Sequence, residues 1–188
     1  MGSAAQSACD FRDQFALRDA CSAFGLLLDR WMVRIHSRQL GEIEVNPEQI
    51  LDFPNGVPGF ERQRRFVLVE RAAFAPIVFL QCVDAPEVCF FTAPLAAIDP
   101  RYELAVTPED LSVIGLCDPL QLANRDELIY LAVLAAAENG LWAANLLAPI
   151  LIERRSRRGV QAVRVDSRYS HRHPIGPAGK PGSEASCS

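Results

Sequence analysis

Short apolar runs separated by turn residues dominate residues 32–175. Residues 42–45 alternate polar and apolar side chains, which is typical of a strand with one buried face. Two turn dipeptides, Asn-Gly and Pro-Gly, stand close together within residues 54–61, so this segment is predicted to form a compact double turn. Strands this short, between turns this frequent, predict a mostly β fold.

The same patterns predict further strands and one helix. The strand segments are apolar or alternating runs, at residues 66–69, 77–80, 101–106, 144–152 and 160–165, with Phe90 and Phe91 in another. Thr107 precedes a proline and two acidic residues, which predicts the N-terminus of a short helix. The Arg-rich residues 153–159 are predicted to be a turn between the last two strands.

Residues 126–140 fit two structures. Their alanines, and the Asn-Gly pair at the end, favour a helix that stops at residue 140. The continuous apolar run at residues 128–134 equally suits a buried strand. Composition alone leaves both open.

The cysteines carry no metal or disulfide motif. The chain has six, at positions 9, 21, 82, 89, 117 and 187, with no C-x-x-C and no histidine at ligand spacing. If residues 84–87 form a hairpin loop, Cys82 lies opposite Cys89, and opposed cysteines can be close enough to bridge. Single thiols in a chain without a secretory signal are instead expected to be reduced.

The two ends of the chain differ from residues 32–175. An amphipathic helix could form between Cys9 and Trp31, and Met32 could be the initiator, so residues 1–31 are interpreted as an extension or a mis-called start. Residues 176–188 are rich in Gly, Pro and Ser and are predicted to be disordered. Since no run of 18 apolar residues occurs, we expect a cytoplasmic protein that does not bind a membrane.

Few side chains could carry out catalysis. The chain has three histidines, of which His171 and His173 would share a face if they lie on a strand. It has no G-x-S-x-G, no H-E-x-x-H and no phosphate-binding glycine loop. A catalytic or small-molecule-binding barrel would also need a deep polar pocket with converging titratable groups. We therefore expect no enzyme activity, no cofactor and no small-molecule substrate.

Charge is unevenly spread along the chain. Residues 32–153 hold 8 Arg and 17 Asp or Glu, a net charge of −9, whereas residues 154–173 hold 7 Arg and 1 Asp, a net charge of +6. An acidic body favours encounter with a basic protein over direct contact with nucleic acid. The Arg runs at 62–65 and 154–158 could be solvated turns, a protein contact or an RNA contact. Because they lack interleaved aromatic residues, solvated turns are expected.

Several segments, taken in order, resemble the FliW family of flagellar assembly factors. They are GEIEV at residues 41–45, FPNGVPGFE at 53–61, LQCVD at 80–84, ANLLAPI at 144–150, GVQ at 159–161 and YSHRHP at 169–174. Cys82 stands where the family commonly has Ser, and Ala143 where it commonly has Thr. The resemblance runs from Met32 to Ile175.

The resemblance implies a small antiparallel β-barrel-like domain with one or two short helices, and it favours a strand at residues 126–137. It also implies a non-enzymatic protein that binds flagellin and antagonises CsrA, a translational repressor with a basic, RNA-binding surface. Free flagellin would then restore repression of its own mRNA. The alternative is a flagellin-specific chaperone without translational control.

Phe60, Glu61 and Asp84 are the candidate partner-binding residues, because ordered turns on rigid strands commonly carry binding residues. A purely structural role is the alternative explanation for two residues of the first turn. Gly59 could serve backbone geometry, and Phe60 could belong to the core. Asn145, a polar residue within an apolar strand, is expected to satisfy buried backbone groups rather than to touch a partner.

Overall fold

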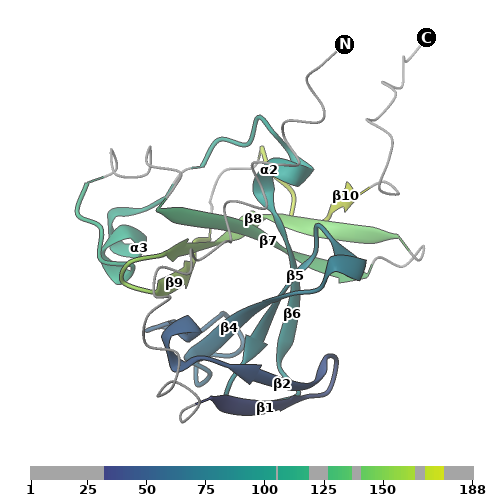
Figure 1. Cartoon of the computed structure of the whole chain (residues 1–188). Coiled ribbons are helices and arrows are strands. Elements are labelled where there is room, and N and C mark those ends of the chain that lie inside the picture. Colours follow the sequence, from purple (N-terminus) through teal and green to yellow (C-terminus); the bar gives the residue numbers. More distant parts are fainter. Residues whose placement is uncertain (1–31, 105, 119–126, 137–140, 164–167, 176–188) are drawn as a thin grey trace, which may run out of the picture. The chain divides into compact units, whose positions relative to one another are not determined.

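The computed structural model describes residues 32–104, 106–118, 127–136, 141–163 and 168–175 (Figure 1). Seven strands form a closed barrel, in the order β8-β7-β6-β5-β4-β3-β9, with β9 pairing back to β8. Their bounds are β3 Leu51–Asp52, β4 Arg65–Glu70, β5 Val78–Cys82, β6 Cys89–Pro94, β7 Leu128–Ala136, β8 Trp142–Glu153 and β9 Arg158–Gln161. Neighbouring strands are antiparallel, except that β3 and β9 are parallel.

Two smaller β elements accompany the barrel. β10 (His173–Ile175) pairs with the start of β8, and β1 (Val33–Ser37) and β2 (Gly41–Val45) form a separate two-stranded sheet. Among the described residues, the α-helices are α2 (Leu95–Ile98) and α3 (Pro108–Val113), neither long enough to cross a membrane. Two 3-10 turns, η1 (Pro47–Gln49) and η2 (Ala72–Phe74), complete the elements. The predicted mostly β, barrel-like fold is confirmed.

Local patterns located most elements correctly. The predicted strands at 42–45, 66–69, 77–80 and 144–152 correspond to β2, β4, β5 and β8, and Phe90 and Phe91 lie in β6. The ambiguous segment at 126–140 contains β7, as the resemblance implied. The side chain of Thr107 accepts a hydrogen bond from the Asp110 N–H (3.1 Å) and caps α3 as predicted.

The remaining strand prediction, at 160–165, is confirmed in part, because β9 ends at Gln161 and residues 164–165 lie outside the described residues. The Arg-rich segment before it is the predicted turn. The buried Glu153 carboxylate accepts hydrogen bonds from the N–H groups of Arg155 (3.0 Å) and Ser156 (2.5 Å). The expectations for residues 1–31 and 176–188 also lie outside the described part.

The prediction of a strand at 101–106 is wrong for the residues that the structure describes there. Tyr102 stacks on Tyr169, with ring centroids 4.3 Å apart, and its hydroxyl donates to the Leu146 carbonyl (2.7 Å). Leu104 packs against a different buried cluster. The alternation therefore comes from three apolar side chains, Tyr102, Leu104 and Val106, that anchor a loop without strand pairing.

The predicted register of the β5–β6 hairpin is also wrong. Gln81, not Cys82, lies opposite Cys89. The reason is a loop one residue longer than expected: the Val88 carbonyl accepts from the Cys82 N–H (2.9 Å), so residues 83–87 separate this pair, and the Val88 N–H donates to the Ala85 carbonyl (2.9 Å). A shift of one residue moves a side chain to the other face of a sheet, so the two thiols are not opposed. Both are free, and burial raises the pKa of Cys89 to about 11.

An enlarged bulge interrupts β8. Leu131 of β7 pairs with Ile150, but Val133 pairs with Asn145, so residues 146–149 stand opposite Ala132 alone. The Asn145 Oδ1 accepts hydrogen bonds from the N–H groups of Leu147 and Ala148, each 3.1 Å long. These two amides lack a ladder partner in the bulge, so the predicted role of Asn145 is confirmed.

Replacing Asn145 tests this role. Asn145→Ala should lower the free energy of unfolding by about 1–3 kcal/mol, since it leaves two backbone amides without their acceptor. Asn145→Asp keeps an acceptor oxygen and should be destabilised less. Urea denaturation of both variants measures the difference, and an alanine variant as stable as the native chain would contradict the role.

Candidate functional site

Two side chains buried in the core, Phe53 and Val57, anchor the double turn at residues 54–61. The Phe53 ring packs edge-on against Phe66, with centroids 5.0 Å apart. Within the turn, the Gly56 N–H donates to the Phe53 carbonyl (2.8 Å), and the Phe60 N–H donates to the Val57 carbonyl (2.6 Å). The turn is therefore the compact structure that its sequence predicts.

Two glycines in this turn have backbone conformations that other residues rarely adopt, with φ of +67° at Gly56 and +85° at Gly59. A Cβ at Gly56 would also lie 2.6 Å from the Glu61 Cα, whereas a Cβ at Gly59 would meet nothing within 4 Å. Gly59 thus serves backbone geometry, as the structural explanation held. Gly56 serves geometry and close packing together.

Phe60 and Glu61 lie side by side on the outer part of the turn. Phe60 is 38% exposed and packs edge-on against Phe90 of β6, with centroids 5.2 Å apart, so it is not a core residue. The Glu61 Oε1 accepts a hydrogen bond from the Gly59 N–H (2.8 Å). This bond lowers the Glu61 pKa and keeps the exposed carboxylate charged.

Asp84 lies on a separate loop, residues 83–88, that joins β5 to β6. The Arg65 Nε donates to its Oδ2 (2.9 Å), and Arg65 Nη2 donates to its Oδ1, so the ion pair is bidentate. The hydrogen bonds from Arg65 lower the Asp84 pKa. Both side chains are about half exposed, which leaves the carboxylate accessible to a partner.

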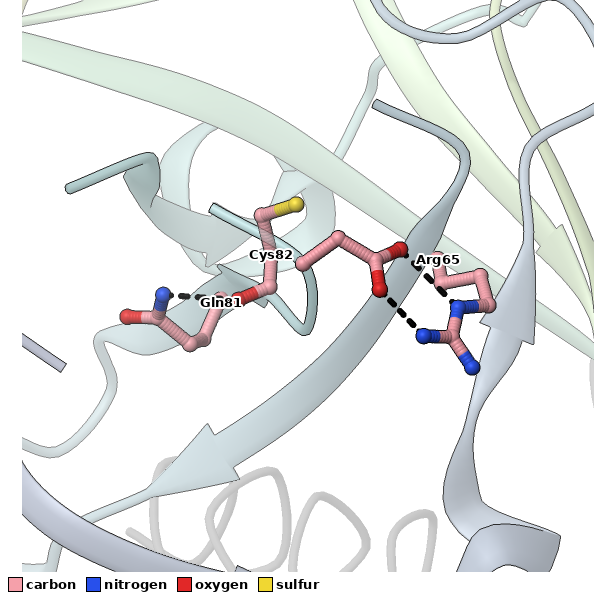
Figure 2. A network of polar contacts seen from close by, with 4 residues as sticks. Arg65, Gln81 and Cys82 are labelled. Carbon is pink, nitrogen blue, oxygen red and sulfur yellow. Dashed lines mark hydrogen bonds and ion pairs between the residues drawn. The ribbon is translucent and has the colours of Figure 1, made fainter. Parts of the chain in front are cut away.

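Two residues that hold this loop, Arg65 and Gln81, were not predicted from the sequence (Figure 2). Arg65 was hidden within an Arg run that was expected to be solvated. Gln81 is fully buried, and its Nε2 donates to the carbonyls of Cys82 (2.9 Å), Val88 (3.1 Å) and Pro86 (3.3 Å). A glutamine between apolar strand residues was the one signal that could have revealed it.

The turn at 54–61 and the loop at 83–88 are each linked to the strands β4 and β6. Phe60 reaches Phe90, and Val83 N–H donates to the carbonyl of Arg65 (2.9 Å), four residues beyond Glu61. We call the exposed part of these segments, with Phe60, Glu61 and Asp84, the turn surface. It presents the exposed Glu61 carboxylate, the Asp84 carboxylate paired with Arg65, and the partly exposed Phe60 ring. No group of metal-binding side chains occurs among the described residues.

The FliW protein family model matches residues 34–175. The chain belongs to the FliW family. It is 34% identical to the flagellar assembly factor FliW of Syntrophomonas wolfei over 144 residues, which cover 76% of this chain and 88% of that protein. Its identity to FliW of Bacillus subtilis is 31% over 142 residues, covering 76% and 96% of the two chains.

A solved FliW structure has the same fold. The crystal structure of a flagellar assembly factor FliW superposes with a TM-score of 0.66 and 26% sequence identity, covering 77% of this chain and 97% of that chain. Together with the family match, this confirms the resemblance read from residues 32–175. The family is one of flagellar assembly factors.

The two turn glycines give a matched pair of variants. Gly59→Ala should cost about 1–2 kcal/mol of unfolding free energy, because only the left-handed backbone is strained. Gly56→Ala should cost clearly more, because the new methyl group also meets backbone atoms of Phe60 and Glu61. Chemical denaturation compares them directly. Equal losses would contradict the close packing at Gly56.

Proposed function

We propose that this protein binds flagellin and antagonises CsrA in the cytoplasm, which couples flagellin translation to flagellar assembly. Membership of a family of flagellar assembly factors supports a flagellar partner. Under this proposal CsrA occupies the turn surface, and flagellin relieves the antagonism by taking this protein away from CsrA. No enzymatic step and no cofactor is part of the proposal.

The negative charge of residues 32–153 is the observation that supports the proposed binding of CsrA. Residues 32–153 have a net charge of −9, and the carboxylates of the turn surface keep lowered pKa values. A basic, RNA-binding partner such as CsrA is therefore attracted to this acidic protein over a wide pH range. The turn surface is also rigid, because both carboxylates are held by hydrogen bonds within the chain.

A second function, a flagellin-specific chaperone without translational control, is favoured by a different feature. Phe74, Phe79, Phe91 and Trp142 form a continuous row of ring contacts, with centroids 5.6, 5.2 and 5.7 Å apart. The two ends of the row, Phe74 and Trp142, are 53% and 41% exposed. The two exposed ends of this row, supported by the buried Phe79, are able to shield apolar surface on an unassembled subunit.

Calorimetry of the full chain separates the two functions. Monomeric flagellin and CsrA from the same organism are titrated singly, and each titration is then repeated in the presence of the other. The proposal predicts binding to both, with flagellin weakening the apparent affinity for CsrA. Binding to flagellin alone supports the chaperone, and binding to neither contradicts both functions.

Three variants that each remove one negative charge test the turn surface. Glu61→Gln and Asp84→Asn keep the shape of the side chain and should each weaken CsrA binding by roughly three- to tenfold, because an interfacial charge is lost. Glu109→Gln, in the first turn of α3, removes the same charge away from the turns and should leave the affinity nearly unchanged. If all three variants bind equally well, the placement is wrong.

A further inference from the structure

The β1–β2 hairpin is attached to the barrel without a shared strand ladder. β1 and β2 pair only with each other among the described strands, and the barrel strands pair in their own sheet. Ile35, Ile43 and Val45 of the hairpin pack with Val67 of β4 in one buried cluster. Apolar packing of this kind holds two layers together but leaves their relative position loosely specified, unless directional contacts fix it.

The directional contact is made by a buried pair, Ser37 at the end of β1 and Gln81 of β5. The Ser37 hydroxyl donates to the Gln81 Oε1 (2.6 Å), and both residues are at most 5% exposed. The same hydroxyl oxygen accepts from the N–H groups of Gln39 (3.3 Å) and Leu40 (3.1 Å), which shapes the turn of the hairpin. One serine therefore joins the hairpin turn to the barrel.

The other end of the Gln81 amide holds the loop that carries Asp84. Its Nε2 points at carbonyls before, within and after the tip of that loop, those of Cys82, Pro86 and Val88. A second link runs directly from the hairpin, since the Arg38 N–H donates to the Pro86 carbonyl (3.2 Å). Figure 2 shows the hydrogen bond from Gln81 to the Cys82 carbonyl and, separately, the ion pair of Arg65, whose partner is Asp84.

We propose that Ser37 and Gln81 are positioning residues for the Asp84 loop, so that the docked β1–β2 hairpin sets the affinity of the turn surface for CsrA. This inference rests on the proposed function. An aliphatic side chain would fill the Gln81 position without burying an amide. The amide instead connects one hydroxyl of the hairpin with three carbonyls around the loop. Loss of the serine hydroxyl releases the hairpin turn and leaves the Gln81 oxygen without its donor.

Four variants of the full chain, titrated with CsrA by calorimetry, test the inference. Ser37→Ala and Ser37→Val both remove the hydroxyl and should weaken CsrA binding about fivefold. Ser37→Thr matches valine in volume, keeps the hydroxyl and should bind within twofold of the native chain. Asn145→Ala removes hydrogen bonds from β8, a strand that pairs with neither β5 nor the hairpin, and should leave CsrA affinity unchanged.

The outcomes separate this inference from the function on which it rests. A native chain that does not bind CsrA overturns the proposed function, and the inference with it. A native chain that binds, with Ser37→Val binding equally well, overturns the inference alone. Equal weakening by Asn145→Ala and Ser37→Val also overturns it, because the effect would then follow from lost stability. Valine has a higher strand propensity than alanine, so Ser37→Val still tests the inference if Ser37→Ala does not fold.

Discussion

Phe53 occupies the space that any side chain at position 159 would need. A Cβ on Gly159 would lie 2.4–2.7 Å from three atoms of the Phe53 ring. This contact joins β3 to β9, whose parallel pairing consists of Asp52 and Arg158 and is the seam that closes the barrel. Because so short a ladder provides few hydrogen bonds, the buried ring, which contributes about 1.5–3 kcal/mol, stabilises the seam. The same residue begins the double turn, so barrel closure also places Phe60 and Glu61.

Polar side chains form hydrogen bonds with the backbone groups that lie outside the regular strand pairing of the barrel. Asn145 accepts from the amides of the β8 bulge, Glu153 accepts from those of the β8–β9 turn, and Gln81 donates to carbonyls of the β5–β6 loop. Each of the three stands at a point where backbone groups have left the ladder. Buried or half-buried polar groups of this kind fix the conformation of a loop more than they add to its stability. Of the three, Gln81 is the one that holds a loop of the turn surface.

The sequence predicted what depends on neighbouring residues. The strand alternation at 42–45, the two turn glycines and the Thr107 cap are local, and each was found where expected. Most failures arose where contacts between residues far apart in the sequence determine the local structure. Tyr102 alternates like a strand residue because it stacks on Tyr169, 67 positions along the chain. Gln81 could not be linked to Ser37 because 44 positions separate them. The Cys82 register is the exception, since it failed on the local conformation of the β5–β6 loop.

For the candidate site, the sequence predicted the exposed residues but not the residues that hold them. Phe60, Glu61 and Asp84 are exposed on turns, as their positions in the sequence indicated. Their intramolecular partners were not foreseen, because Arg65 pairs with Asp84 across two strands. The acidic charge could be calculated from the sequence, whereas the hydrogen bonds that hold the two carboxylates could be found only in the structure.

Hydrogen exchange of the full chain, with and without CsrA, tests the central claim that the turns form one surface for a basic partner. The proposal predicts that CsrA slows exchange in peptides covering residues 37–41, 54–62 and 83–88, while peptides covering β8 and β10 exchange at unchanged rates. Protection confined to β8 and β10, with the three turns unaffected, would contradict it.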